Sequence, residues 1–318
     1  MTDVIDLQAI GAELRIYGEI DHPEMRHMNP SIAWSGKDLK IAIRSCNFAV
    51  IPKGKWYFRD GTVYSRTDVL YGDLNPDTLE VSNLTKLNLS KDSPKDVLLA
   101  GLEDVRLFSR KDGMHAIGFQ SDRITRTLHN ASASLGEYLI KGNELQYIRT
   151  LKKPVKDAVE KNWSSTDKPS KLFDFTYSDS QVCKDGELIG KPTRTQIHGG
   201  SILLKQKDGT YLSLVHEKKI DTQLSHSVRY NKYNRGNRGG LIYDKYIYYT
   251  YLARHDKQGI ITELSSPFRF GTLENIEFAS GLAEYKDCFI MTLGIRDCKV
   301  GIVKIEKSKL LSLIKEKQ

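Results

Sequence analysis

One tight turn recurs along this chain and restricts the fold more than any other feature. An Asp-Gly pair stands between short apolar or aromatic runs at residues 60–61, 112–113 and 208–209. Asp-Gly supplies the positive φ that hairpin turns require, so each pair predicts two antiparallel strands joined by a hairpin. The predicted strands of these hairpins are residues 55–58 and 62–64, 105–108 and 116–119, and 202–204 and 211–215.

The rest of the chain continues this β pattern from end to end. Helical periodicity is scarce, and further strands are predicted at residues 39–44, 171–177, 245–251 and 288–293. Units of roughly fifty to sixty residues fit about five times into the chain, which suits radial repetition of small antiparallel sheets. We therefore expect an all-β fold, a single five-bladed β-propeller domain over residues 1–318. A double-layered sandwich and two packed β-domains are the alternatives.

Three segments interrupt the rhythm. Residues 90–98 are polar and include a proline, which fits a link between blades. Residues 229–240 are basic, aromatic and glycine-rich, a composition that suits sugar stacking, phosphate binding or simply a solvated loop. Residues 308–317 alternate leucine and isoleucine with lysine, which predicts a short C-terminal helix.

Composition limits the partners and the compartment. The formal net charge of +8 favours an acidic or phosphate-bearing partner, but the charge is spread along the chain, so nucleic acid is the less favoured partner. The four cysteines form no C-x-x-C pair, which argues against a disulfide framework or a zinc site. A secretory signal and a membrane-spanning run are missing from the sequence, so we expect a cytoplasmic protein with no membrane partner.

The segment Gly101 to Phe108 is the first candidate for chemistry, because it places two acids and an arginine on one predicted strand. Side chains alternate between the faces of a strand, so Glu103 and Asp104 point in opposite directions. A second catalytic group must then come from another part of the chain. The alternative is that these acids form ion pairs with Arg106 or another cation at the end of a strand.

Several motifs resemble a known family in their order along the chain. Residues 101–106, Gly-Leu-Glu-Asp-Val-Arg, resemble the Gly-x-Glu-Asp-Pro-Arg motif of the five-bladed propeller enzymes typified by the family 130 mannoside phosphorylases and hydrolases, with related mannosyltransferases. The other matching stretches are Asn29-Pro30-Ser31 with Arg44, Glu160-Lys161-Asn162-Trp163, His198-Gly199-Gly200-Ser201 with Val215-His216-Glu217, and the last run from Ser266 to Asp297. These matches span nearly the whole chain.

The resemblance implies an enzyme that cleaves or transfers a glycosidic bond. Such a reaction needs a proton for the leaving oxygen and a nucleophile on the other face of the sugar, and carboxylates suit both tasks. The resemblance assigns the general acid to Asp104, an orienting role to Glu103, and tuning of Asp104 or binding of substrate oxygens to Arg44 and Arg106. The remaining candidates fall into three groups: Glu160, Glu217, Glu277 and Asp297 as the base, Asn29, Lys161, Asn162, His198, His216, Glu217 and Asp297 as substrate ligands, and Trp163, Tyr177, Tyr249 and Tyr251 as stacking rings.

Two departures from the family pattern leave the reaction open. Val105 stands where the motif has proline, and residues 174–178 stand where the phosphorolytic members carry a phosphate-binding His-Arg-Pro. Phosphorolysis is therefore in doubt, and transfer from an activated sugar donor to a glycan or polyanionic acceptor is the close alternative. A non-catalytic propeller that binds glycan or nucleic acid is the second alternative. The expected ligands are a carbohydrate, with phosphate or a sugar nucleotide left open, and neither a cofactor nor a metal is predicted.

Overall fold

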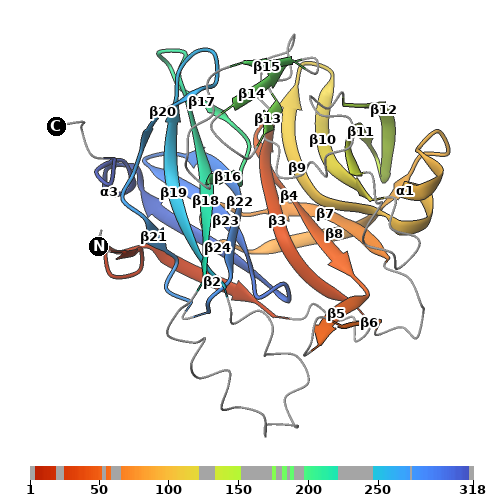
Figure 1. Ribbon diagram of the computed structural model, residues 1–318, viewed down its shortest axis with the longest axis horizontal. Helices are drawn as coiled ribbons and strands as arrows, with labels where there is room; N and C mark the ends of the chain where they lie inside the picture. The colour runs from red at the N-terminus through yellow and green to blue at the C-terminus, as the bar shows by residue number, and fades with distance from the viewer. Residues whose placement is uncertain are drawn as a thin grey trace, which may run out of the picture.

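Strands make up most of the part of the chain that the structure describes (Figure 1). The computed structural model describes residues 4–18, 25–51, 55–58, 66–121, 133–151, 174–176, 181–184, 187–189, 197–220, 246–272 and 274–314. Two short helices, α1 (Lys95–Ala100) and α3 (Lys307–Leu311), accompany the strands within these ranges. The predicted all-β class is confirmed.

The largest sheet consists of two antiparallel meanders. Its order is β3-β4-β7-β8-β12-β11-β10-β9. The two halves join where β8 and β12 run parallel, at Asn88 beside Glu144 and Leu89 beside Leu145. The strands are β3 (Arg26–Ser35), β4 (Asp38–Cys46), β7 (Thr67–Leu74), β8 (Val81–Leu89), β9 (Leu102–Arg110), β10 (Gly113–Ser121), β11 (Ala133–Lys141) and β12 (Glu144–Thr150).

A second sheet is built around the long hairpin of β18 and β19. Its order is β1-β21-β19-β18-β16, and β17 and β20 add to β18 and β19. The short β1 is parallel to β21, so the start of the described chain lies beside a strand near its end. The strands are β1 (Ile5–Asp6), β16 (Ile197–Gly199), β17 (Leu204–Lys205), β18 (Tyr211–Ile220), β19 (Tyr246–His255), β20 (Ile261–Leu264) and β21 (Phe268–Arg269).

A third sheet joins the two ends of the chain, because β2 pairs antiparallel with β24 and completes the order β2-β24-β23-β22. Its strands are β2 (Glu13–Tyr17), β22 (Glu277–Tyr285), β23 (Cys288–Ile295) and β24 (Lys299–Glu306). Two small sheets are separate from the others, β13 (Asp174–Thr176) with β14 (Gln181–Lys184) and β15 (Glu187–Ile189), and β5 (Phe48–Ile51) with β6 (Lys55–Phe58). Pairing of the N-terminal strand β2 with β24 covers an edge of β24 that would otherwise be open, and brings the two ends of the chain into one sheet.

Three large hydrophobic cores lie between neighbouring sheets. One joins Leu252 and Phe268 of the β18–β19 sheet to Met291 of β23. A second lies between the two meanders of the largest sheet, and the third joins Ile41 of β4 to Ile302 of β24. The β2–β24 sheet therefore packs against both of the other large sheets, and apolar burial of this kind contributes about 1.5 to 3 kcal/mol for each large side chain.

Polar contacts hold the innermost strands together where the sheets meet. The Ser31 hydroxyl of β3 accepts a hydrogen bond from the Leu107 backbone N–H of β9 at 2.9 Å. On its other side, the Pro30 carbonyl accepts hydrogen bonds from Ser280 at 2.7 Å and from Thr292 at 2.6 Å. Strands β3, β9 and β22 therefore face one another, and Figure 1 shows β3 and β9 across from β18 and β22.

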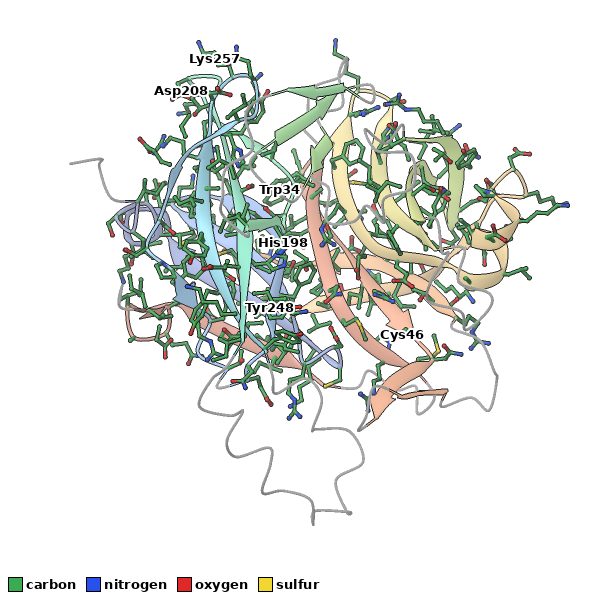
Figure 2. All side chains as sticks on the ribbon, viewed as in Figure 1. Trp34, Cys46, His198, Asp208, Tyr248 and Lys257 are labelled. Carbon is green, nitrogen blue, oxygen red and sulfur yellow. The ribbon has the colours of Figure 1, made fainter. Side chains whose placement is uncertain are left out.

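Two of the three predicted Asp-Gly hairpins are confirmed. Residues 111–112 turn between β9 and β10, and residues 207–209 turn between β17 and β18, with Asp208 at the rim of the molecule (Figure 2). The turn at residues 60–61 lies outside the described residues. The strands predicted at residues 39–44, 245–251 and 288–293 correspond to β4, β19 and β23, and of residues 171–177 only 174–176 are described, as β13.

Both helices differ from the sequence prediction. The C-terminal helix spans Lys307–Leu311 instead of residues 308–317, because the chain turns back after Leu311 and Ile314 forms a β-bridge with Ser265. Helix α1 lies where the sequence predicts a polar link over residues 90–98. Pro94 is the N-cap residue, where the missing backbone N–H of proline interrupts no helical hydrogen bond, and Val97 and Ala100 are buried. The number of blades stays a prediction.

Candidate active site

Two residues of the site have a backbone conformation that side-chain-bearing residues seldom adopt. Asn29 has φ +48° and Asp104 has φ +46°. Each lies at an irregularity of its strand, because the register of β3 against β4 shifts between Met28 and Ser31, and that of β9 against β10 shifts at Asp104. Bulges of this kind redirect a side chain at a cost of about 1 to 3 kcal/mol per strained residue. Both redirected side chains meet in the site.

The Asp104 carboxylate lies between an amide and a guanidinium from another meander. Asn29 Nδ2 donates to Asp104 Oδ1 at 2.7 Å, and Arg44 Nη1 donates to the same oxygen at 2.9 Å. The Asp104 side chain keeps 11% of its surface exposed. An acid from β9 is thus bound by donors that lie 75 and 60 residues earlier in the chain.

Arg44 bridges both acids of the pair, so the expectation that Glu103 and Asp104 point in opposite directions is wrong, because the bulge at Asp104 breaks the alternation of the strand. Its Nη2 lies 3.0 Å from Glu103 Oε2, while its Nη1 contacts Asp104. Burial works against the charge of Arg44, but the carboxylates of Glu103 and Asp104 outweigh it and raise the pKa of Arg44 above its ordinary value. The site therefore holds a permanent cation between two carboxylates, and a planar guanidinium can bind both with paired donors.

Glycines permit the close approach of strands around this group. A Cβ at Gly294 would lie 2.1 Å from Asn29 Oδ1 and 2.8 Å from the Asn29 nitrogen. A Cβ at Gly101, where φ is +86°, would lie 1.7 Å from the carbonyl oxygen of Thr67. The end of β23 and the start of β9 therefore pack directly against backbone, which fixes Asn29 and the strand that carries Asp104.

Aromatic rings form a second side of the site. His216 stacks on Tyr248 with ring centroids 5.3 Å apart and meets the edge of Phe278 at 4.9 Å. His198 lies 5.3 Å from His216, and Figure 2 shows His198 and Tyr248 near the middle of the molecule. Burial, together with the charges of Asp297 and Asp104, raises the pKa of Tyr248 above its ordinary value. Its phenol therefore stays protonated at neutral pH, within electrostatic reach of both acids.

Arg106 and Asp297 also lie in the region of Phe278 and Tyr248. Arg106 is 2% exposed, and its guanidinium lies 5.3 Å from the centre of the Phe278 ring. Asp297 lies in the turn after β23 with φ +51°. Asn29, Arg44, Glu103, Asp104, Arg106, His198, His216 and Asp297 are thus the predicted site residues that the structure brings into one neighbourhood.

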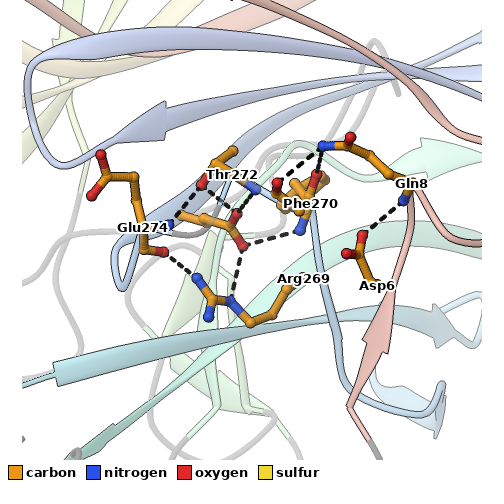
Figure 3. A network of polar contacts seen from close by, with 8 residues as sticks. Asp6, Gln8, Arg269, Phe270, Thr272 and Glu274 are labelled. Atoms are coloured by element: carbon orange, nitrogen blue, oxygen red, sulfur yellow. Dashed lines mark hydrogen bonds and ion pairs between the residues drawn. The ribbon is translucent and has the colours of Figure 1, made fainter.

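Two other candidate carboxylates have different surroundings. Glu277 is fully buried and accepts hydrogen bonds from Arg269 Nε at 3.2 Å, the Phe270 nitrogen at 3.0 Å and the Thr272 nitrogen at 2.9 Å (Figure 3). Glu217 accepts a hydrogen bond from the Tyr251 hydroxyl at 2.7 Å and lies 3.1 Å from Lys219 Nζ. Glu277 therefore stabilises a loop. The described contacts of Glu217 are with Tyr251 and Lys219 and not with the Asp104 group.

Glu160, Lys161 and Asn162 lie outside the described residues, as do Trp163 and Tyr177. The predicted base Glu160 and these predicted ligands stay predictions. Among the described residues, no group of three or more His, Cys, Asp and Glu side chains could hold a metal ion. No helix in the described ranges is long and apolar enough to cross a membrane.

Sequence reasoning missed Tyr248 and Phe278. It selected Tyr249 and Tyr251 from the same aromatic strand, and residues one apart point to opposite faces. Tyr248 lies on the face of His216, whereas Tyr251 binds Glu217 on the other. If the pairing register of β19 with β18 were known, strand alternation would show which tyrosines share a face with His216. The sequence does not give that register.

The comparisons with known proteins agree with this arrangement of sheets. The chain matches no protein-family model and no curated protein. Its structure resembles that of a protein from work on the GH130 family of mannoside phosphorylases. That family contains glycoside hydrolases that target β-1,2 mannosidic linkages in Candida mannan. That match has a TM-score of 0.62 and 16% identity, and covers 89% of this chain and 85% of the other.

Two further structures show the same likeness. A β-1,2-mannobiose phosphorylase from Listeria innocua has a TM-score of 0.55 at 13% identity, covering 94% of this chain and 99% of the other. A GDP-Man-dependent mannosyltransferase from Leishmania mexicana has a TM-score of 0.56 at 14% identity, covering 92% and 89%. The expected resemblance is confirmed at the level of the fold: this chain has the fold of these mannoside-processing proteins.

Proposed function

We propose that the protein cleaves or transfers a glycosidic bond of a mannoside-type carbohydrate, with Asp104 as the general acid. The observation that carries this proposal is the Asp104 carboxylate itself. It sits on a strained bulge, keeps some solvent exposure, and is bound by Asn29 and Arg44 from a different meander. Backbone strain retained at one acid by long-range contacts is typical of a functional site.

The chemistry needs a proton at the leaving oxygen of the glycosidic bond and polar groups that orient the sugar. Asp104 supplies the proton, and Asn29 and Arg44 hold its carboxylate in one direction. Glu103 and Asp297 are suited to sugar hydroxyls, and the Tyr248 hydroxyl adds a neutral donor beside them. The base or nucleophile is proposed to be Glu160, one of the four carboxylates that the matching sequence motifs offer for this role.

The surrounding architecture in this proposal is a single five-bladed β-propeller with the site at the mouth of its central channel. The two meanders of the largest sheet, the β18–β19 sheet and the closing β2–β24 sheet would form four blades. Strands β13 to β15 would belong to the remaining one. A ring of this kind gathers side chains from distant parts of a chain around one hollow.

Transfer from an activated sugar donor is the second candidate. Residues 174–176 form β13 with the sequence Asp-Phe-Thr, in place of the phosphate-binding His-Arg-Pro of phosphorolytic enzymes. One protein of this fold is a GDP-Man-dependent mannosyltransferase. Phosphate or a sugar nucleotide is accordingly the second ligand to test.

One assay separates these reactions. The protein is incubated with aryl mannosides and β-linked mannobiose, with and without inorganic phosphate, and separately with GDP-mannose and a mannoside acceptor. Release of mannose without phosphate indicates hydrolysis, a requirement for phosphate indicates phosphorolysis, and consumption of GDP-mannose only with acceptor indicates transfer. Glycan binding without turnover in any reaction would support the non-catalytic alternative and reject the enzymatic proposal.

A further inference from the structure

Arg106 has contacts that differ from those of the other cation in the site. Its Nε donates to the Gly200 carbonyl at 2.6 Å, and its Nη1 donates to the Asp104 carbonyl at 2.9 Å and to the Val105 carbonyl at 3.3 Å. Arg44 binds the two carboxylates, whereas Arg106 binds backbone carbonyls. The two guanidiniums therefore hold different parts of the same bulge.

These carbonyls belong to the irregular part of β9. In the register of β9 against β10, Ile117 pairs with Arg106 and Phe119 pairs with Glu103, so Asp104 and Val105 fall between paired positions. A backbone carbonyl that leaves the ladder needs another donor when it is buried. Arg106 supplies that donor to both residues of the bulge.

Gly200 gives Arg106 a firm anchor in another sheet. A Cβ at Gly200 would lie 2.6 Å from the Ala279 carbonyl oxygen and 2.7 Å from the Leu214 carbonyl oxygen. The Gly200 peptide is thus wedged between β22 and β18 and has little room to move. A contact from Arg106 to this peptide ties the bulge to a fixed point.

Burying this cation is costly. Burial lowers the pKa of Arg106 to about 10, with Asp104 opposing the change and Arg44 adding to it. The backbone carbonyls of Gly200, Asp104 and Val105 offset this cost, because each accepts a hydrogen bond from the guanidinium and would otherwise lack that donor.

We infer that Arg106 is a positioning residue, whose guanidinium holds the Asp104–Val105 bulge against Gly200 and thereby directs the Asp104 carboxylate at Asn29 and Arg44. The inference rests on the proposed function only in naming Asp104 as the proton donor. The sequence motif offered Arg106 either for tuning of Asp104 or as a ligand of substrate oxygens, without a contact for either role, and here its described contacts are with backbone and with the Phe278 ring.

Two variants and a matched control test this role. Arg106→Lys keeps a charge but cannot bond in two directions from one plane, and Arg106→Met removes the charge as well. Arg110→Met is the control, because Arg110 lies on the same strand and also over a phenylalanine, at 4.9 Å from the Phe108 ring. Its ion pair is with Glu137 at 2.6 Å, outside the Asp104 group.

Turnover is the first readout. For each Arg106 variant we expect kcat per folded molecule to fall about 100-fold, because misplacement of a catalytic group by about 1 Å has effects of that size. We expect KM to change by less than about three-fold, since the hydrogen bonds of Arg106 Nε and Nη1 are with the main chain. Arg110→Met should lower the melting temperature and leave kcat unchanged.

Two spectroscopic readouts do not depend on turnover. The side-chain amide signal of Asn29, assigned by its loss in Asn29→Gly, should shift in both Arg106 variants, because it reports the 2.7 Å contact with Asp104. The Asp104 carboxyl carbon, assigned by its loss in Asp104→Asn, should titrate at higher pH in Arg106→Met and not in Arg110→Met. The charged or titratable groups around Asp104 are Arg44 of β4, Glu103 and Arg106 of β9, Tyr248 of β19 and Asp297. Arg106→Met removes one cation from this set, which disfavours the charged form of Asp104.

The outcomes are distinct. A wild-type kcat in Arg106→Lys, with an unshifted Asn29 amide, overturns the inference and leaves Arg106 as a structural residue. If the wild-type protein turns over no carbohydrate, the proposed function fails, and the Asn29 and Asp104 signals still decide the role of Arg106. If Arg106→Met does not fold, Arg106→Lys and its Asn29 signal give the answer.

Discussion

Asp104 and Glu277 are both carboxylates at sheet edges in this protein, and their surroundings differ in a way that separates chemistry from support. Glu277 is 0% exposed, and its donors come from Arg269, Phe270 and Thr272, within eight residues of it. Asp104 is 11% exposed, and its donors Asn29 and Arg44 lie on a different meander.

The backbone conformations at Asp104 and Glu277 differ as well. Asp104 and its partner Asn29 both have positive φ, at +46° and +48°, and Glu277 is not among the residues with that conformation. The donors to Glu277 are close in sequence and hold one loop, and Figure 3 shows Gln8 bound to Phe270 of that loop. Long-range donors around a strained Asp104 fix one acid in space. The comparison predicts that changes near Asp104 alter turnover and that changes near Glu277 alter stability.

The largest effect is expected from Arg44→Met. Removing this cation leaves Glu103 and Asp104 facing each other partly buried, and breaking such a pair costs about 3 to 5 kcal/mol. Turnover should also disappear. The destabilisation should shrink as the pH falls below about 5, because protonation of the two acids removes their repulsion. Urea unfolding at pH 7 and pH 4 measures this, and an equal cost at both values would contradict the account.

Glu277→Gln should give the next largest effect on stability. A glutamine amide has one acceptor oxygen, so its NH₂ group would face a backbone N–H or the Arg269 guanidinium, at a cost of about 2 to 4 kcal/mol. Because Glu277 lies outside the Asp104 group, kcat per folded molecule should stay at the wild-type value. A loss of kcat greater than about ten-fold in fully folded protein would remove the distinction between the two carboxylates.

Gly294→Ala tests whether the position of Asn29 matters for turnover. The new methyl group would approach the Asn29 nitrogen within 2.8 Å, so Asn29 must move, and overpacking of this kind costs about 1 to 3 kcal/mol. Turnover should fall with it, because Asn29 then loses its contact with Asp104. The control is Gly18→Ala, where a Cβ meets nothing within 4 Å, and both activity and melting temperature should be unchanged.

The smallest change in stability is expected from Asn29→Gly. Glycine accepts the positive φ without strain, which offsets the lost amide bond, so the free energy of unfolding should change by less than about 1 kcal/mol. Turnover should still decrease about ten-fold, since one of the donors to Asp104 is missing. Wild-type turnover in this variant would show that the amide does not position the acid.

The sequence predicts the strands and the acid pair better than it predicts their partners. Asp-Gly turns at residues 112–113 and 208–209 are local signals, because the turn residues themselves impose the conformation. The Glu103–Asp104 pair was also visible in its motif, and so was Arg44. The contact of Arg44 with both acids depends on which strands lie side by side, and the spacing of residues along the chain does not show this.

The missed features depend on register. Tyr248 and Tyr249 are neighbours in sequence, and only the pairing of β19 with β18 decides which of them shares a face with His216. The short helix α1 was missed because it has only six residues and buries only Val97 and Ala100 of its apolar side chains. The C-terminal helix was overestimated because Ile314 pairs with Ser265. In each case a tertiary contact outweighs a local pattern.

The most direct test of the central claim is the turnover of Asp104→Asn, measured on the substrate identified by the mannoside assay. Asparagine keeps the shape of the side chain but cannot donate a proton as an acid does, so we expect kcat to fall about 1,000-fold. The circular dichroism spectrum should stay that of the folded wild-type protein, so that the loss of kcat is measured on folded molecules. Turnover of Asp104→Asn at the wild-type rate would contradict the account, because the acid would then have to be another residue.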